Sequence, residues 1–184
     1  MSEILDSGER REFSSGAVRD MSEGKGRMDL MPLDIVSELC NKYEEYRKLR
    51  SLPTFNASYM FGSIDDFAQT GDVDRIYYLL SSFICYGYAD IETALLDVSI
   101  HYEQGAKKYV ERNWEKGIDA HSFIDSALRH GIKVLRGDDD EPHGRAFIWN
   151  LLGVLWIIEH KPEFNDLPYI KSELNSETRK EYIK

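Results

Sequence analysis

The sequence predicts an all-α protein, and three observations support that fold class. Apolar residues recur at helical spacing along most of the 184-residue chain, an arrangement typical of amphipathic helices. Capping residues, prolines and glycines stand where such helices would begin and end. No long segment alternates between apolar and polar residues as a half-buried strand does. A chain of this length is expected to form one domain.

Helix boundaries follow from the same signals. Pro32 suits the first turn of a helix, and that helix should end before Pro53. A loop is expected over residues 51–62. Asp90 is a candidate cap for a later helix, and Gly137 a candidate terminator. The expected helices span about residues 32–50, 63–70, 74–87, 91–109, 119–136 and 142–159.

The last of these helices should lie at the centre of the protein. From Phe147 to Ile158 it is apolar on nearly every side, which is typical of a helix packed all round. Gly105 is a second unusual feature, because it lies on the apolar stripe of an earlier helix. A glycine inside a helix costs about 1 kcal/mol relative to alanine. We therefore expect a close helix crossing or a ligand beside Gly105.

The two ends of the chain are polar. Residues 1–27 contain few large apolar residues and are expected to form a flexible arm, and residues 161–184 a polar C-terminal tail. Glycines beside Lys25 and Arg27 could wrap a phosphate with backbone N–H groups, or the segment could be a solvated tail. The spacing is not that of a P-loop. The all-α domain itself is expected over residues 28–160.

Composition excludes several classes of function. The formal net charge of −10 argues against a binder of nucleic-acid polymers or anionic membranes. It does not exclude a small anionic ligand in a local basic pocket. No apolar run is long enough for a transmembrane helix, and no signal peptide is visible. Cys40 and Cys85 lie in apolar patterns and are expected to be buried free thiols in a reducing, cytoplasmic compartment.

Asn150 is the most informative polar residue, because it lies between Trp149 and Leu151 in the predicted central helix. A buried amide without partners costs about 1–3 kcal/mol. It should therefore meet either another helix or a ligand. His143 precedes it by seven residues, so both lie on nearly the same helix face, about 10.5 Å apart along the axis. That separation suits the two ends of a groove for a nucleotide, although His143 could also be an ordinary surface residue.

Charged residues gather on neighbouring predicted helices. Glu103 and Lys107 are four residues apart, and so are Asp125 and Arg129, which allows an ion pair on one face in each case. Solvated ion pairs are one interpretation. The other is a polar site, because the row of Ser126 and His130 lies beside that of Asp125. Carboxylates in such a site could bind Mg²⁺ or Mn²⁺, which prefer oxygen ligands.

Two further features have two interpretations each. The acidic run from Asp138 to Glu141 precedes a helix, where negative charge is favoured by about 0.3–1 kcal/mol per residue. It could also supply a ligand to the polar site. Trp114 is expected on a loop, where it could stack on a nucleotide base or fill the core.

Ordered motifs then point to a family. GAVRD, GKGRMDLMP, HYEQGAKKYVERNWEKG, DSALRH, GDDDEPH and WNLLG follow one another in the chain. In this order they resemble the phage-associated dATP/dGTP diphosphohydrolase N-terminal family, which is similar to the MazG-like all-α nucleotide pyrophosphatases and includes MazZ-type enzymes. The resemblance covers residues 16–32 and about 99–156. Residues from about 51 to 88 look like an insertion relative to shorter members of the family.

The resemblance implies a MazG-like helical bundle that forms a homo-oligomer in the cytoplasm of a bacterial host. It implies hydrolysis of a purine deoxynucleoside triphosphate, dGTP or dATP, to the monophosphate with Mg²⁺ or Mn²⁺. Asp125 and the Arg129–His130 pair fall where MazG-like enzymes carry an E-x-x-E motif, and Asn150 falls where a later aspartate stands. The E-x-x-E motif itself is absent, and Glu103, Asp125 and the Asp140–Glu141–His143 group are its expected replacements.

These observations give a set of expected site residues. The expected catalytic residues are Glu103, Asp125 and His130, and the expected metal ligands are Glu103, Asp125 and Glu141. The expected substrate-binding residues are Arg27, Lys107, Lys108, Arg112, Asn113, Trp114, Arg129, His143 and Asn150. The alternative is a phage protein that binds a nucleotide immune signal, such as a cyclic nucleotide or an ADP-ribose derivative, without cleaving it. An interaction domain without a ligand would leave Asn150 unexplained.

Overall fold

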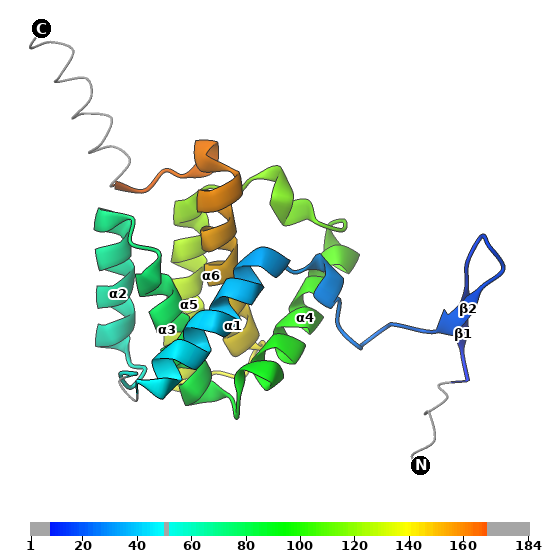
Figure 1. Ribbon diagram of the computed structural model, residues 1–184, viewed down its shortest axis with the longest axis horizontal. Coiled ribbons are helices and arrows are strands. Elements are labelled where there is room, and N and C mark those ends of the chain that lie inside the picture. Colours follow the sequence, from blue (N-terminus) through cyan, green and yellow to red (C-terminus); the bar gives the residue numbers. More distant parts are fainter. Residues whose placement is uncertain (1–7, 50–51, 169–184) are drawn as a thin grey trace, which may run out of the picture.

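The computed structural model describes residues 8–49 and 52–168, and it confirms the all-α fold class. Six α-helices form one body around α6 (Figure 1). They are α1 (Leu33–Lys48), α2 (Ala57–Thr70), α3 (Asp74–Gly87), α4 (Ile91–Lys108), α5 (Ala120–Arg136) and α6 (His143–His160). Short 3₁₀ turns lie at η1 (Met28–Leu30), η2 (Asn113–Lys116) and η3 (Pro162–Phe164).

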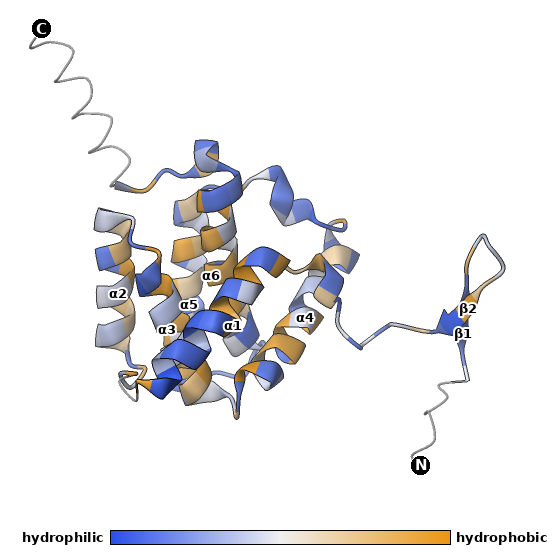
Figure 2. Cartoon of the chain, viewed as in Figure 1, coloured by the Kyte–Doolittle hydropathy of each residue, from blue (hydrophilic) through white to orange (hydrophobic). Residues whose placement is uncertain are grey.

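The central position expected for the last helix is confirmed. α6 packs against α1, α3, α4 and α5, and its residues from Ala146 to Leu155 are buried except Trp149, which is half-buried. Hydrophobic residues dominate α6, whereas α1 carries both kinds (Figure 2). Gly153 permits close contact with α5, because a Cβ there would lie 2.5 Å from a ring carbon of Phe123. The buried residues of α6 therefore form the centre of the hydrophobic core around which the other helices are placed.

Two predictions differ from the structure, one for the start of a helix and one for the burial of the cysteines. α2 begins at Ala57, within the segment expected to be a loop, because the side chain of Asn56 caps it by accepting a hydrogen bond from Tyr59 N at 2.9 Å. Cys85 is exposed and Cys40 is half-buried, so neither is the fully buried thiol that was expected. The cap predicted at Asp90 is confirmed by a 2.8 Å hydrogen bond from Thr93 N.

The N-terminal segment contains structure that the sequence pattern did not predict. β1 (Arg10–Glu12) and β2 (Val18–Asp20) pair antiparallel, and this hairpin stands apart from the helices (Figure 1). Residues 24–27 then lie against α4, where Arg27 N donates to Ser99 O at 2.9 Å. The last part of the arm is therefore held on the body. Residues 1–7 and 169–184, at the outer ends of the expected arm and tail, lie outside the described residues.

Within the described residues, no helix is both long and apolar enough to cross a membrane.

Candidate functional site

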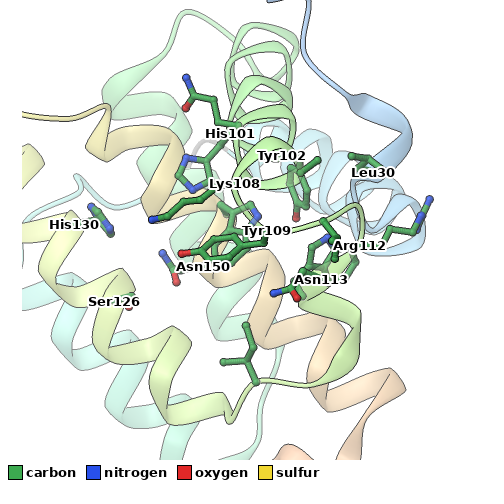
Figure 3. Close-up of a pocket in the computed structure, with 17 residues that line it drawn as sticks. Leu30, His101, Tyr102, Lys108, Tyr109, Arg112, Asn113, Ser126, His130 and Asn150 are labelled. Carbon is green, nitrogen blue, oxygen red and sulfur yellow. The ribbon is translucent and has the colours of Figure 1, made fainter. Parts of the chain in front are cut away.

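A cavity of about 440 Å³ lies between α4, α5, α6 and the turn η2 (Figure 3). Its volume is within the range of small-molecule sites, which is about 300–1,000 Å³. Its polar lining includes His101, Lys108, Arg112, Asn113, His130 and Asn150. Five of these, all except His101, belong to the set of expected site residues.

The charge of the cavity is opposite to that of the whole chain. Lys108 and Arg112 line it, whereas none of the described lining residues is acidic. Lys108 has no carboxylate within salt-bridge distance among the described residues, and its Nζ lies 5.0 Å from the centre of the Tyr109 ring. Its ammonium projects into the cavity in Figure 3. An unpaired cation beside a half-enclosed cavity is suited to binding an anion.

Arg112 is held in place by its backbone as well as by its side chain. Its φ of 53° makes it the only non-glycine residue with positive φ in the described part of the chain. Such a conformation costs about 1–3 kcal/mol. The guanidinium donates to the carbonyl oxygen of Asp29 at 2.6 Å and pairs with Glu115. These contacts fix the guanidinium at the edge of the cavity.

Asn150 does not meet another helix, which was one of its two predicted interpretations, and the other, a ligand, stays a prediction. The residue is 5 % exposed, and its Nδ2 donates to Ala146 O, one turn earlier in α6, at 2.8 Å. Its amide also faces the cavity (Figure 3). The bond to Ala146 O is the only hydrogen bond of the Asn150 side chain within the described residues, so Asn150 Oδ1 can accept one from a ligand.

Two imidazoles complete the polar wall. His101, from α4, lies with its ring centre 5.5 Å from that of Trp149. Burial, together with the positive charge of Arg145, lowers the pKa of His101 to about 4. Burial also lowers the pKa of His130, from α5. Both rings are therefore neutral at pH 7, and a neutral imidazole can accept a proton.

Trp114 fills the core, which was one of its two expected positions. It is 7 % exposed, and its ring meets Trp156 edge-on with 4.8 Å between the ring centres. Its Nε1 is buried without a hydrogen-bond partner in the described residues. Trp114 lines the cavity, but its contact with Trp156 makes it part of the wall, and a base would have to bind beside it.

The carboxylate of Glu103 binds the N-terminal segment. The residue is 6 % exposed, and its carboxylate accepts hydrogen bonds from Gly24 N and Gly26 N, both at 2.8 Å. These contacts and the ion pair with Lys107 hold the pKa of Glu103 below its usual range. Gly26 has a φ of +81°, and a Cβ there would overlap the hydroxyl of Ser99. The glycine-rich turn therefore wraps a carboxylate of the chain itself, where a phosphate was one of the expectations.

Several predicted residues lie outside the cavity. Arg27 pairs with Asp29 and Glu111, and Lys107 pairs with Glu23 and Glu103. Asp125 and Arg129 form an exposed ion pair on α5. This corrects the expectation that these four side chains would face one substrate site, because their charges are already paired with neighbours on the surface.

The three expected metal ligands are not brought together. Within the described residues, neither Glu103 nor Asp125 belongs to a group of three or more side chains that could share a metal ion. Glu141 instead lies near His130 and His143. The carboxylate site expected for Mg²⁺ or Mn²⁺ therefore does not fit the structure, because Glu103 is enclosed by Gly24 and Gly26 while Asp125 faces solvent.

His143 lies behind the cavity and does not line it. Its side chain is 1 % exposed, its Nε2 is 2.7 Å from Asp140 Oδ1, and its Nδ1 is 3.0 Å from His130 Nδ1. The predicted groove from His143 to Asn150 is thus interrupted by the ring of His130. The contact between the two imidazoles was not expected, because the residues lie 13 positions apart on different helices.

Sequence reasoning missed His101 and Tyr109, which also line the cavity. A signal existed: His101, Gly105, Lys108 and Arg112 follow one another at spacings of three or four residues, which would place them on one face of a helix. Gly105 has nothing within 4 Å of an added Cβ, so a close helix crossing does not explain this glycine, and the ligand alternative stays a prediction.

The structure is thus that of an all-helical protein with a cavity lined by Lys108 and Arg112. Residues 84–167, which include α4, α5 and α6, match the family model described as dATP/dGTP diphosphohydrolase, N-terminal. The resemblance deduced from the motifs is confirmed over these residues, and all the cavity residues except Leu30 lie within them. No curated protein and no solved structure matches the chain.

Proposed function

We propose that the chain hydrolyses a purine deoxynucleoside triphosphate, dGTP or dATP, to the monophosphate. The observation that carries this proposal is the basic cavity between α4, α5 and α6, which contains no acid among its described lining residues. The description of the matching family names the same activity. A triphosphate is the part of such a substrate that requires cations, and Lys108 and Arg112 provide them.

The side chains suggest how the substrate would bind. Lys108 and Arg112 would contact the phosphates, since charge-assisted hydrogen bonds are the strong ones. Asn150 Oδ1 would accept a hydrogen bond from an amino or hydroxyl group of the base or sugar. Asn113 and the aromatic wall that contains Trp114 would contact the remaining surface of the nucleoside.

In the proposed reaction, water attacks the α-phosphorus, the bond to the bridging oxygen breaks, and pyrophosphate leaves. Neutral His130 and His101 are the imidazoles of the cavity wall that could accept the proton of the water. A divalent ion, implied by the resemblance, would neutralise phosphate charge, but Glu103, Asp125 and Glu141 do not meet to hold one within the described residues.

Capture of an intact nucleotide is the second candidate, and one observation favours it. A cavity with cations and without carboxylates can bind phosphates, but its described lining offers no carboxylate ligand for Mg²⁺. A homo-oligomer and a location in the host cytoplasm, both implied by the resemblance, stay predictions.

Product analysis tests the proposal. The full chain is incubated with dGTP or dATP and Mg²⁺ or Mn²⁺, and the nucleotides are separated by ion exchange. We expect dGMP or dAMP and one equivalent of pyrophosphate. Retention of the intact triphosphate by the protein would support capture instead. Absence of both binding and turnover at high protein concentration would contradict both functions.

A further inference from the structure

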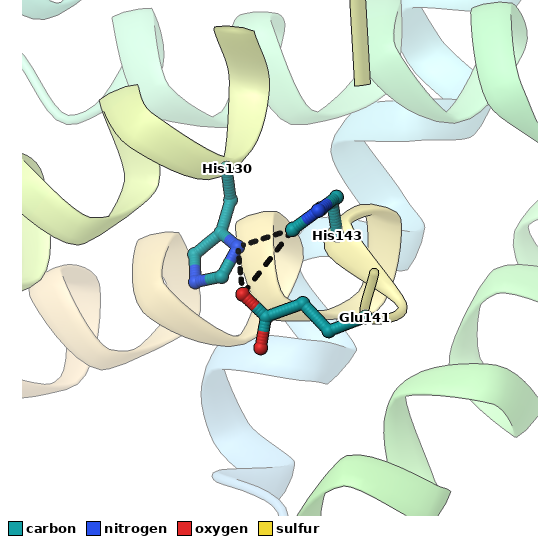
Figure 4. Close-up of side chains that lie close together, drawn as sticks. All are labelled: His130, Glu141 and His143. Atoms are coloured by element: carbon teal, nitrogen blue, oxygen red, sulfur yellow. Dashed lines mark hydrogen bonds and ion pairs between the residues drawn. The ribbon is translucent and has the colours of Figure 1, made fainter. Parts of the chain in front are cut away.

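Three side chains face one another at the junction of α5 and α6, and of these only His130 also lines the cavity. They are His130 on α5, His143 at the start of α6, and Glu141 just before it (Figure 4). His130 Nδ1 and His143 Nδ1 are 3.0 Å apart, and Glu141 Oε1 lies 3.7 Å and 3.4 Å from them. From this geometry we propose a transition-metal site formed by two imidazoles and one carboxylate.

The distances suit one ion at the centre of the three atoms. Ligand atoms at about 2.0–2.1 Å from Zn²⁺ in tetrahedral geometry lie about 3.3–3.4 Å from each other. The three separations in the structure bracket that value. Three protein ligands leave the fourth position for water, and Glu141, which is half-exposed, provides a route for an ion from solvent.

A neighbouring carboxylate prepares one imidazole for the metal. His143 Nε2 lies 2.7 Å from Asp140 Oδ1, so the ring proton belongs on Nε2 and a lone pair remains on Nδ1. A carboxylate that holds a histidine in this way is the usual outer partner of a metal-bound imidazole. Asp140 is itself held by Lys133 Nζ at 2.8 Å. His143 is therefore oriented before any ion binds.

The group of His130, Glu141 and His143 is more buried than two other groups of side chains that could hold a metal ion. Asp34, Glu159 and His160 are all exposed, and Asp119 and His121 are exposed beside half-buried Asp166. By contrast, the side chains of His130 and His143 are 17 % and 1 % exposed. Without a metal the two imidazoles would share one hydrogen bond. Two nitrogen ligands favour Zn²⁺, Co²⁺ or Ni²⁺ over Mg²⁺, which prefers oxygen.

Titration with Co²⁺ tests the site without any nucleotide, so its result is independent of the proposed hydrolysis. We expect one equivalent of Co²⁺ to give the visible d–d absorption of a four-coordinate ion. Zn²⁺ should abolish that absorption, and millimolar Mg²⁺ should not.

Glu141→Gln should weaken Co²⁺ binding at least about tenfold. Asp139→Asn is the matched control, because Asp139 is an exposed acid of the same segment, and it should change the affinity less than twofold. Both positions are accessible to solvent, so circular dichroism should show both variants folded. No absorption with wild type, or equal loss in both variants, would overturn the proposal. So would binding that Glu141→Gln leaves unchanged and His160→Gln or His121→Gln removes.

Discussion

At the scale of single residues, one carboxylate shows how a plausible catalytic acid can have another role. Glu103 is spaced for an ion pair with Lys107, and that pair forms at 2.9 Å. The same carboxylate accepts the N–H groups of Gly24 and Gly26, which are 79 and 77 residues away in sequence. Its position therefore stabilises the docking of the N-terminal segment on α4.

This role predicts a pH dependence. Contacts with Gly24, Lys107 and Gly26 lower the pKa of Glu103 in the folded state. A depressed carboxyl pKa contributes stability that is present above the unfolded value and lost as pH falls through the folded value. Amide hydrogen exchange at residues 22–27 should therefore accelerate, beyond its intrinsic pH dependence, when pH falls below the ordinary value of 4.5.

The substitution Glu103→Gln should produce the same acceleration at neutral pH, because the ion pair with Lys107 is lost. Glu92→Gln is the control, since Glu92 is an exposed acid at the other end of α4. Protection of residues 22–27 that survives in Glu103→Gln would show that other contacts hold the segment.

At the scale of elements, α4 has two faces with different surroundings. One face carries Glu103 and Lys107 towards the N-terminal segment, and the other carries His101, Gly105 and Lys108 towards the cavity. Both faces come from one helix of 18 residues. The helix therefore connects the docked arm to the candidate binding site.

Gly105→Ala tests the cavity face. An added Cβ would have nothing within 4 Å, and alanine is favoured over glycine in a helix by about 0.5–1 kcal/mol. The free energy of unfolding in urea should rise by about that amount. Affinity for dGTP should fall, because the methyl group enters the space proposed for the ligand. Higher stability with unchanged affinity would show that no ligand approaches Gly105.

Periodicity and composition predicted the elements better than their contacts. The apolar sides of α6 predicted its central place, and the capping signal predicted Asp90. The hairpin of β1 and β2 was missed because three-residue strands leave no clear alternation. The partners of Glu103 and the contact of His130 with His143 could not be predicted. Helical spacing fixes which residues share a face, but not which distant segment covers that face.

At the scale of the whole molecule, the formal charge of −10 and the local charge of the cavity have opposite signs. The negative surface should disfavour polyanions such as nucleic acids, whereas a small nucleotide can reach Lys108 and Arg112. The central claim is that this cavity is the nucleotide site.

The most direct test compares two adjacent lysines by calorimetric titration with dGTP. Lys108 lines the cavity without a carboxylate partner among the described residues, whereas Lys107 pairs outside it with Glu23 and Glu103. A lost charge-assisted hydrogen bond is worth about 1.5–3 kcal/mol. Lys108→Gln should therefore weaken binding about 10- to 100-fold, and Lys107→Gln less than threefold. Equal effects of the two substitutions, or a larger effect of Lys107→Gln, would contradict the assignment of the cavity.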